Sequence, residues 1–232
     1  MEPVSIVIPT LNEVDAIGPV IREIPAPFAG DVIVADSGST DGTRDAAKAA
    51  GARVIEAGRG YGRACAMGAE AADPASTVIV FMDGDGADRG DLVGLIAGPV
   101  LDGSHDFVLA SRTRGECEPG SMLWHQLLAG RLAGLGIGAR YGTRYTDMCA
   151  FRAIDRAALS RLGLREMTYG WNIEMQMQAA RARLRIMEIP LPYRRRMAGT
   201  SKVAGSLGGT ARAASKIVST YCRVATSPAP RA

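Results

Sequence analysis

The segment from Val78 to Asp88 restricts the possible folds of this chain more than any other stretch. An unbroken apolar run rich in β-branched residues leads into Asp83. Such a run is typical of a strand that is buried on both faces in a parallel sheet. The run then stops, and the three carboxylates of Asp83, Asp85 and Asp88 fall within six residues. A buried strand that ends on clustered acids predicts a binding site at the edge of the sheet.

Clustered carboxylates are costly to bury unless a cation or several hydrogen-bond donors compensate their charge. A hard divalent ion such as Mg²⁺ or Mn²⁺ prefers oxygen ligands and commonly leaves coordination positions open for substrate phosphate. The alternative is an exposed Asp/Gly turn without any ligand, because both residue types are common in turns. We predict a metal site formed by Asp83, Asp85 and Asp88.

Strand-like and helix-like segments alternate through the first half of the chain. Expected strands cover 4–9, 31–36, 53–56, 78–82 and 107–110, and expected helices cover 12–23, 44–50, 63–71 and 91–101. Asn12 is the expected cap of the first helix. The alternation predicts a three-layer α/β/α fold with a mostly parallel central sheet. Ligands of such sheets bind beyond the carboxyl ends of the strands, where Asp36 and Asp83 both lie.

The pattern changes after residue 111, where a long apolar helix is expected at 122–139. Gly130, Gly134 and Gly138 share one of its faces and would permit close contact with another helix. Three interpretations stay open: a core helix, a helix resting on a membrane interface, and a contact between subunits of a homo-oligomer. Further expected elements are a short strand or loop at 146–152, a helix at 171–181 and a strand at 184–189.

Charge is distributed unevenly, although the net charge is only +3. From Arg181 onward eleven Lys/Arg residues accompany one acid, whereas residues 1–180 hold 16 basic and 23 acidic residues. A basic C-terminal segment indicates contact with something anionic, such as phosphate groups, an acidic membrane surface or nucleic acid. Nucleic acid is not expected, because aromatic residues make up only 5% of the chain and stacking platforms are therefore scarce.

The expected closing helix, at 210–224, is amphipathic. One face carries Ala214, Ile217, Val218, Tyr221 and Cys222, and another carries Arg212, Lys216 and Arg223. Basic amphipathic helices commonly lie on membrane surfaces, and packing on the rest of the domain is the alternative. We therefore divide the chain into one domain at 1–205 and a basic amphipathic helix with a disordered tail at 206–232.

Cysteine spacing and the N-terminal sequence bear on localisation. The four cysteines are far apart and form no CxxC pair, which argues against zinc and a disulfide framework and fits the cytoplasm. No signal peptide is visible, and no apolar run reaches 18 residues, so a spanning helix is not expected. The expected location is cytoplasmic, with peripheral attachment to the cytoplasmic face of a membrane as an option.

Two kinds of ligand contact follow from these residues. Carboxylates and a metal near Asp36 and Asp83 suit a nucleotide diphosphate. The guanidinium groups of Arg112, Arg114 and the basic run 194–202 suit phosphate oxygens. A metal and a cation that neutralise a departing diphosphate would assist its loss from a nucleotide sugar.

Three successive motifs resemble the signatures of family 2 glycosyltransferases with the GT-A fold: Ile8-Pro-Thr-Leu-Asn-Glu13, Asp36-Ser-Gly-Ser-Thr-Asp-Gly-Thr43 and Asp83-Gly-Asp85. Downstream, Ser111-Arg112, Asp147 with Phe151-Arg152, and Arg196 with Gly199-Thr-Ser-Lys202 resemble the branch of dolichyl- and polyprenyl-phosphate sugar synthases. The resemblance covers roughly residues 3–205. It implies an inverting, metal-dependent transfer of a sugar from a nucleotide-diphosphate donor. The acceptor it favours is a polyprenyl (dolichyl-type) phosphate at the membrane surface.

The resemblance also implies roles for individual residues. The nucleotide sugar would contact Pro9, Leu11, Glu13, Asp36, Gly62, Asp83 and Gly84, the metal would be held by Asp83, Asp85 and Asp88, and the phosphates would contact Arg112, Arg114, Arg196, Ser201 and Lys202. Asp147 matches an acidic position near the sugar and the acceptor, and Arg152 would support it. An ionised lipid phosphate needs no general base, whereas an alcohol acceptor would need one, for which Asp147 is the candidate.

The sequence departs from this branch in two places. Ser37 stands where the family often carries a second acid, and Gly86 and Ala87 precede Asp88, so that Asp88 becomes a substitute for the usual third metal ligand. Appended transmembrane helices, which many relatives carry, are not visible. A soluble acceptor therefore remains the alternative to a lipid.

Other functional classes fit less well. Gly60-Tyr-Gly62 before a helix mimics part of a dinucleotide fingerprint, but Cys65 stands where the third glycine belongs. The sequence contains no P-loop and no GxSxG nucleophile elbow. A non-catalytic module that binds anionic surfaces through its basic tail is the remaining alternative of a different class.

Overall fold

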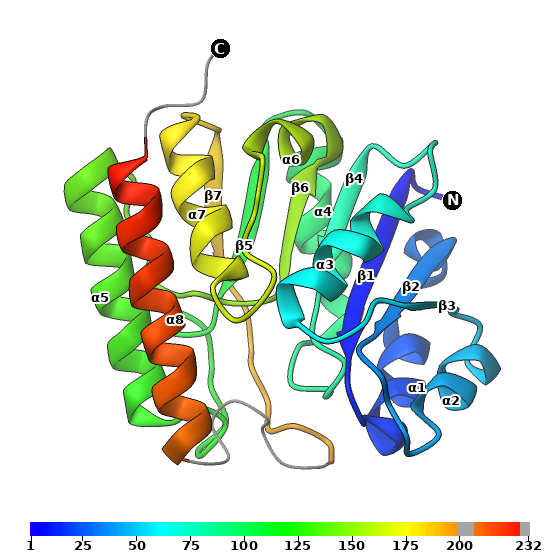
Figure 1. The fold of residues 1–232 in the computed structure, drawn as a ribbon. Coiled ribbons are helices and arrows are strands. Elements are labelled where there is room, and N and C mark those ends of the chain that lie inside the picture. Colours follow the sequence, from blue (N-terminus) through cyan, green and yellow to red (C-terminus); the bar gives the residue numbers. More distant parts are fainter. Residues whose placement is uncertain (199–206, 228–232) are drawn as a thin grey trace.

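The computed structural model describes residues 1–198 and 207–227. Seven strands of these residues form one sheet in the order β3-β2-β1-β4-β6-β5-β7 (Figure 1). They are β1 (Val4–Thr10), β2 (Asp31–Asp36), β3 (Arg53–Glu56), β4 (Val78–Phe81), β5 (Phe107–Ser111), β6 (Arg152–Asp155) and β7 (Ile186–Pro190). The expected tail at 228–232 and the phosphate-contact residues Ser201 and Lys202 lie outside the described residues.

Helices cover both faces of this sheet. They are α1 (Val14–Glu23), α2 (Thr43–Ala49), α3 (Tyr61–Glu70), α4 (Val93–Leu101), α5 (Trp124–Tyr141), α6 (Arg156–Leu162), α7 (Trp171–Arg181) and α8 (Leu207–Thr226), with short 3₁₀ turns η1 (Ala26–Phe28) and η2 (Gly90–Leu92). In the described residues no helix combines the length and the apolar character that a membrane crossing requires.

Alternating side chains of the strands build two separate cores. Ile6 and Ile8 of β1 point to the face that α1, α2 and α4 cover, whereas Val7 points to the face covered by α3 and α5–α8. Both cores consist of aliphatic and aromatic side chains that exclude water from the sheet, which drives the layers together. The three-layer α/β/α fold with a mostly parallel sheet is thus confirmed.

Strand β6 is the exception to the parallel arrangement. It lies antiparallel to both of its neighbours, β4 and β5, while all other pairs are parallel. The sequence suggested only a short strand or loop at 146–152 and gave no sign of α6. The short apolar segment after Asp147 did not show that it pairs in the middle of the sheet, because pairing partners are set by tertiary context.

The glycine face of α5 packs on an extended segment, 143–148, that runs back along the helix. A Cβ atom built on Gly134 would lie 1.9 Å from the carbonyl oxygen of Tyr145, so the backbone occupies the space that a side chain would need. The close contact predicted for this face therefore exists, but its partner is this return segment, which carries Asp147, and not a second helix.

The start of α1 also differs from expectation. The helix begins at Val14 with Glu13 in the N-cap position, where the Glu13 side chain makes no capping hydrogen bond, and the backbone N–H of Val14 donates to Asp41 at 3.2 Å. Asn12 has a φ of 53° and accepts a hydrogen bond from the backbone N–H of Thr40 at 3.0 Å. It therefore ties the first turn to the turn after β2 instead of capping the helix.

Helix α8 packs on α7 with a face that coincides only in part with the expected one. Its most buried residues are Ala213, Thr220 and Val224, and Ile217 and Tyr221 of the expected face are partly buried against the same core. The Arg223 guanidinium donates to Glu174 at 2.9 Å, and the Lys216 ammonium lies 3.4 Å from Glu166. Two of the three basic residues expected to face an anionic surface thus pair with acids of their own fold.

Removing the Arg223 side chain should loosen this docking. Glu174 is fully buried, so Arg223→Ala leaves one of its oxygens without a donor, and we expect a loss of about 1–3 kcal/mol in the free energy of unfolding. Arg212→Ala, on the exposed side of the same helix, is the control and should change stability by less than about 0.5 kcal/mol. Urea denaturation of both variants measures the difference, and equal midpoints would contradict this account.

Candidate active site

Asp36 and Thr10 end two neighbouring parallel strands in register. One oxygen of Asp36, Oδ2, accepts hydrogen bonds from the N–H groups of Gly38 and Ser39, both at 3.0 Å, and lies 3.2 Å from Arg44. Its Oδ1 and the hydroxyl of Thr10 are buried without a partner among the described residues. Buried polar atoms normally have partners, so this pair of orphaned atoms indicates space for polar groups of a ligand.

The turn that follows β1 is held against the turn that follows β2. The backbone N–H of Asn12 donates to the Ser39 hydroxyl, and that of Glu13 donates to the Thr43 hydroxyl, both at 2.8 Å. Pro9 is buried within β1, whereas Leu11 is exposed. The structure therefore brings the predicted 9–13 turn and Asp36 together at one edge of the sheet.

The acidic loop 83–88 follows β4 at the same edge. Asp83 accepts a hydrogen bond from the Tyr61 hydroxyl at 3.3 Å. Burial, together with the negative charges of Asp88 and Asp85, raises the pKa of Asp83 well above its usual value. Burial is also the main cause that raises the pKa of Asp88 to about 6. Carboxylates that raise one another's pKa in this way are suited to a cation.

A segment from the far end of the chain lies across the acidic loop. We call residues 191–198, after β7, the strap. Arg196 donates to Asp85 at 2.6 Å, and the backbone N–H of Met197 donates to the Asp85 carbonyl at 2.8 Å. Arg194 reaches the carbonyl of Gly86 at 2.5 Å and Glu23 of α1 at 2.6 Å. The strap thus places a guanidinium cation on one of the predicted metal ligands.

The donor set fits a metal through two carboxylates, not three. The described residues contain no group of three His, Cys, Asp or Glu side chains that could hold a metal ion together. Asp88 accepts the backbone N–H of Asp83 at 3.0 Å, and Asp85 accepts that of Ala87 at 2.9 Å through Oδ1, so both brace the loop. Asp83 and the Oδ2 atom of Asp85, which Arg196 contacts, are the candidate ligands, and Mg²⁺-type ions are often bound by one or two carboxylates together with substrate phosphates.

Arg112 and Asp147 form the most completely paired charges of the site. The guanidinium donates from Nε and Nη2 to the two carboxylate oxygens, both at 2.7 Å, and the backbone N–H of Arg112 adds a third bond at 3.0 Å. Burial opposes the charge of Asp147, but the hydrogen bonds and the charge of Arg112 outweigh burial and lower its pKa. A low pKa is the opposite of what a general base needs, so the geometry favours a positioning role for Asp147.

Sequence reasoning missed the residues that hold this pair in place. Gln176 of α7 donates to the Asp147 carbonyl at 2.8 Å, and Glu188 of β7 accepts from the backbone and hydroxyl of Thr146. The Tyr193 ring lies 5.0 Å from the Arg112 guanidinium. The available signal was polar residues on otherwise buried elements, since Gln176 is completely buried in its helix.

Arg152 lies beneath the site and not in it. Its side chain is fully buried and donates to the carbonyls of Cys149, Ala150 and Asn172. It can support the loop that carries Asp147, as expected, but it has no surface with which to touch a substrate. Arg114 lies exposed two residues beyond Arg112, outside the Arg112–Asp147 pair.

The two glycines that were predicted to contact the nucleotide sugar, Gly62 and Gly84, both lie where another part of the chain packs closely against them. A Cβ built on Gly62 would lie 2.4 Å from the carbonyl oxygen of Glu166, and one built on Gly84 would lie 2.7 Å from Thr10. Gly84 thereby lets the acidic loop lie close to β1 and to the Thr10 hydroxyl, which has no partner among the described residues. Gly62 instead lets α3 approach the 166–167 segment.

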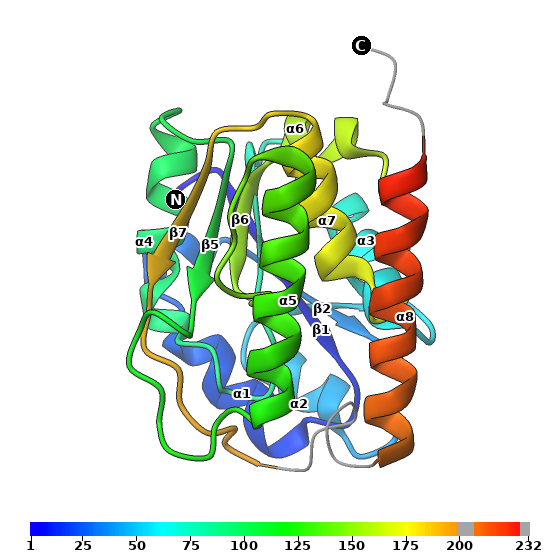
Figure 2. The same cartoon turned by 90° about the vertical axis from the view of Figure 1, so that its left-hand side faces the viewer.

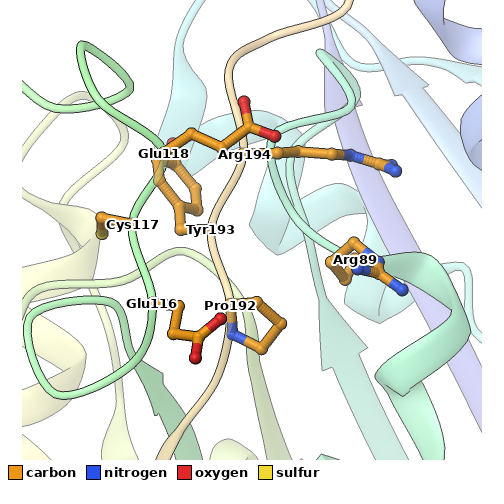
Figure 3. A pocket seen from close by; sticks show the side chains of 7 residues that line it. All are labelled: Arg89, Glu116, Cys117, Glu118, Pro192, Tyr193 and Arg194. Carbon is orange, nitrogen blue, oxygen red and sulfur yellow. The ribbon is translucent and has the colours of Figure 1, made fainter.

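A cavity of about 280 Å³ opens between the strap and the loop after β5 (Figure 3). Its lining residues are Arg89, Glu116, Cys117, Glu118, Pro192, Tyr193 and Arg194. Tyr193 lines this cavity, and its ring also lies 5.0 Å from the Arg112 guanidinium. The cavity carries both signs of charge and adjoins the site through the strap.

Comparison with known proteins gives relatives that span nearly the whole chain. An uncharacterized glycosyltransferase of Mycobacterium tuberculosis is 34% identical over 213 residues, covering 89% of this chain and 92% of the relative. The dolichyl-phosphate hexose transferase of Haloferax volcanii is 33% identical over 211 residues, covering 89% of each chain. At these coverages the similarity to both relatives extends beyond the N-terminal motifs and includes the region of Asp147.

A solved structure matches the fold. The glucosyl-3-phosphoglycerate synthase of Mycobacterium tuberculosis, crystallised with Mn²⁺, UDP-glucose and phosphoglyceric acid, superposes with a TM-score of 0.76 at 24% identity, covering 97% of this chain and 80% of the other. At that identity the likeness concerns the GT-A fold alone. The family model described as "Glycosyl transferase family 2" matches residues 5–163. The chain therefore belongs to glycosyltransferase family 2 and is an enzyme that uses a nucleotide sugar.

Proposed function

We propose that this enzyme transfers a sugar, with inversion, from a nucleotide-diphosphate donor to a lipid phosphate of the polyprenyl type. The observation that carries the proposal is the proximity of carboxylates and guanidinium groups in one site. Arg196 donates to Asp85 at 2.6 Å, and the charge of Arg112 partly offsets the burial that raises the pKa values of Asp83 and Asp88. A site with both signs of charge can bind a cation and phosphates at once.

In the proposed reaction an acceptor phosphate oxygen attacks the anomeric carbon. The bond from that carbon to the diphosphate breaks, and the nucleoside diphosphate leaves with the electron pair. Asp83 and Asp85 would hold a divalent cation, Mg²⁺ or Mn²⁺, which neutralises charge on the leaving diphosphate. Arg112, fixed by Asp147, would bind a phosphate through the part of its guanidinium that remains accessible.

The donor's base and ribose are assigned to the edge formed by β1 and β2. The orphaned oxygen of Asp36 can accept an N–H or O–H from the ligand, and the Thr10 hydroxyl can donate or accept. Arg196 is assigned to phosphate contact once it leaves Asp85. Because a phosphate acceptor is already ionised at neutral pH, the low basicity of Asp147 is no obstacle.

A soluble phosphorylated acceptor is the second candidate. The fold neighbour crystallised with phosphoglyceric acid supports it, whereas the dolichyl-phosphate hexose transferase among the relatives supports a lipid. Incubation with labelled donor and either a short polyprenyl phosphate or 3-phosphoglycerate separates the two. We expect label in the organic phase; label only in the aqueous product would reject the lipid acceptor.

Donor binding should depend on metal. We expect UDP- or GDP-sugars to raise the melting temperature in the presence of Mn²⁺ or Mg²⁺ and not in EDTA, because ligand binding stabilises by about 2.7 kcal/mol at 100 times the dissociation constant. Asp83→Asn should abolish the metal-dependent shift, whereas Asp45→Asn, on the exposed side of α2, should keep it. A shift in Asp83→Asn equal to that of the wild type would remove Asp83 from the metal site.

A further inference from the structure

Helix α5 leaves a row of large apolar side chains uncovered. The exposed fractions are 74% for Trp124, 48% for Leu128, 60% for Leu132 and 69% for Leu135. Their spacing of four, four and three residues places them on one side of the helix. The opposite side, with Gly130, Ala133, Gly134 and Ile137, is the one buried against the fold. This helix is therefore apolar on two sides and covered on only one.

Helix α8 continues this surface. The two helices lie side by side along one flank of the molecule (Figures 1 and 2), and Gly136 of α5 packs against the Tyr221 ring of α8. Val218 of α8 is 62% exposed, and Ala214 and Cys222 on the same side are exposed as well. Three residues of the apolar face predicted for α8, Ala214, Val218 and Cys222, are thus turned outward beside the α5 row, whereas Ile217 and Tyr221 pack against the core.

The exposed charges of α5 and α8 are positive. Residues 119–146 and 207–227 contain six Lys/Arg residues and no Asp or Glu, and two of the six, Lys216 and Arg223, pair with Glu166 and Glu174 of the underlying fold. Arg131 on α5 and Arg212 on α8 are exposed there. A second copy of the chain would bring the same cationic face against it, and like charges oppose such contact. An apolar surface that carries only positive charge is instead complementary to an anionic lipid surface.

We propose that the outer face of α5, continued by α8, rests on an anionic lipid bilayer with Trp124 and the three leucines in the interface. Tryptophan is favoured at the boundary between headgroups and acyl chains, because its ring is apolar and its N–H is polar. The leucines supply the apolar area, and Arg131 and Arg212 meet the headgroup phosphates. The main attachment is thus α5, and not the basic face of α8, whose Lys216 and Arg223 are paired internally.

The same helix separates this surface from the active site. On its inner side, a Cβ built on Gly130 would lie 3.7 Å from the Asp147 carboxylate. An α-helix with its side chains is about 10–12 Å across, so the Arg112–Asp147 pair lies about one helix diameter from the proposed bilayer. This proximity rests on the proposed function in one respect, which is that the acceptor is a lipid phosphate. Such a phosphate could reach Arg112 while its lipid chain stays in the membrane.

Vesicle binding by the full chain tests the surface directly. We expect sedimentation with phosphatidylcholine–phosphatidylglycerol vesicles and weak or no sedimentation with phosphatidylcholine alone. The triple variant Leu128→Gln, Leu132→Gln, Leu135→Gln should bind the anionic vesicles more weakly, by about 10-fold or more for each leucine that is buried in lipid. The matched control is Leu95→Gln on α4, which is 53% exposed on the other face of the sheet and should bind as the wild type does.

Tryptophan fluorescence gives an independent measurement. The chain has two tryptophans, and Trp171 is only 3% exposed, so a blue shift or quenching by brominated lipid reports on Trp124. Trp124→Phe should remove the vesicle-dependent signal. All the replaced side chains of α5 are exposed, so the variants should fold as the wild type does. Their melting temperatures check this.

Three outcomes would overturn the proposal. They are equal vesicle binding by the wild type and the triple variant, no vesicle binding by the wild type, and a wild-type dimer that the leucine substitutions convert to a monomer. These assays contain no nucleotide, metal or acceptor. A negative result therefore leaves sugar transfer to a soluble acceptor intact, whereas vesicle binding without any sugar transfer would reject the proposed function and retain the surface.

Discussion

Arg112→Ala is expected to lower sugar transfer by about 100- to 1000-fold, the usual effect of removing a donor that stabilises charge in the transition state. It should also destabilise the fold by about 3–5 kcal/mol, because Asp147 is 2% exposed and would be left buried without its counter-charge. Steady-state rates with the preferred donor and denaturation curves measure the two effects.

The two effects can be separated by a second substitution. In Arg112→Ala/Asp147→Ala the unpaired carboxylate is gone, so stability should recover while transfer stays low. Arg114→Ala, two residues away and exposed, should leave both quantities close to those of the wild type. If the double variant regained activity along with stability, Arg112 would have a structural role alone.

Gly134→Ala is expected to have the largest effect on stability of any single methyl group added to α5. The new Cβ would lie 1.9 Å from the Tyr145 carbonyl oxygen, so the helix and the return segment must separate. Overpacking of this kind costs about 1–3 kcal/mol, and more where backbone has to move. Because the return segment carries Asp147, transfer activity should fall as well.

Gly130→Ala is the matched control, one turn earlier on the same face. Its Cβ would have only ordinary contacts, at 3.7 Å and beyond, and alanine is favoured over glycine in a helix by about 0.8–1.0 kcal/mol. We therefore expect an unchanged or slightly raised midpoint in urea. Equal destabilisation by both substitutions would show that α5 does not pack on the return segment as described.

The strands of the first half could be predicted from the sequence because they are short segments rich in β-branched apolar residues, bounded by turn residues and alternating with helical patterns. β2 and β3 occur at the predicted residues, and the strand ends place Asp36 and Asp83 at one edge, as parallel topology requires. The position of β6 could not be predicted, because its four residues carry no periodic pattern and its place between β4 and β5 depends on pairing with residues far away in the sequence.

The acidic and basic residues of the site were identifiable by type, but their pairing was not. Nothing in the spacing of Arg112 and Asp147 shows that they bind each other instead of a substrate, since they are 35 positions apart. The same holds for the burial of Arg152 under the loop. Side chains such as Gln176 and Glu188 escaped notice because their role is to hold other residues, and that role leaves no motif.

The contact between Arg196 and Asp85 joins residues 111 positions apart and has a consequence for how the donor enters. While the guanidinium occupies that carboxylate, the loop already has a compensating charge and does not require an ion in order to stay folded. If the donor enters with a metal ion at Asp85, as proposed, it would compete with this tethered side chain. Its apparent affinity would then be lowered by the strength of the Arg196–Asp85 contact, which belongs to the strap and not to the acidic loop.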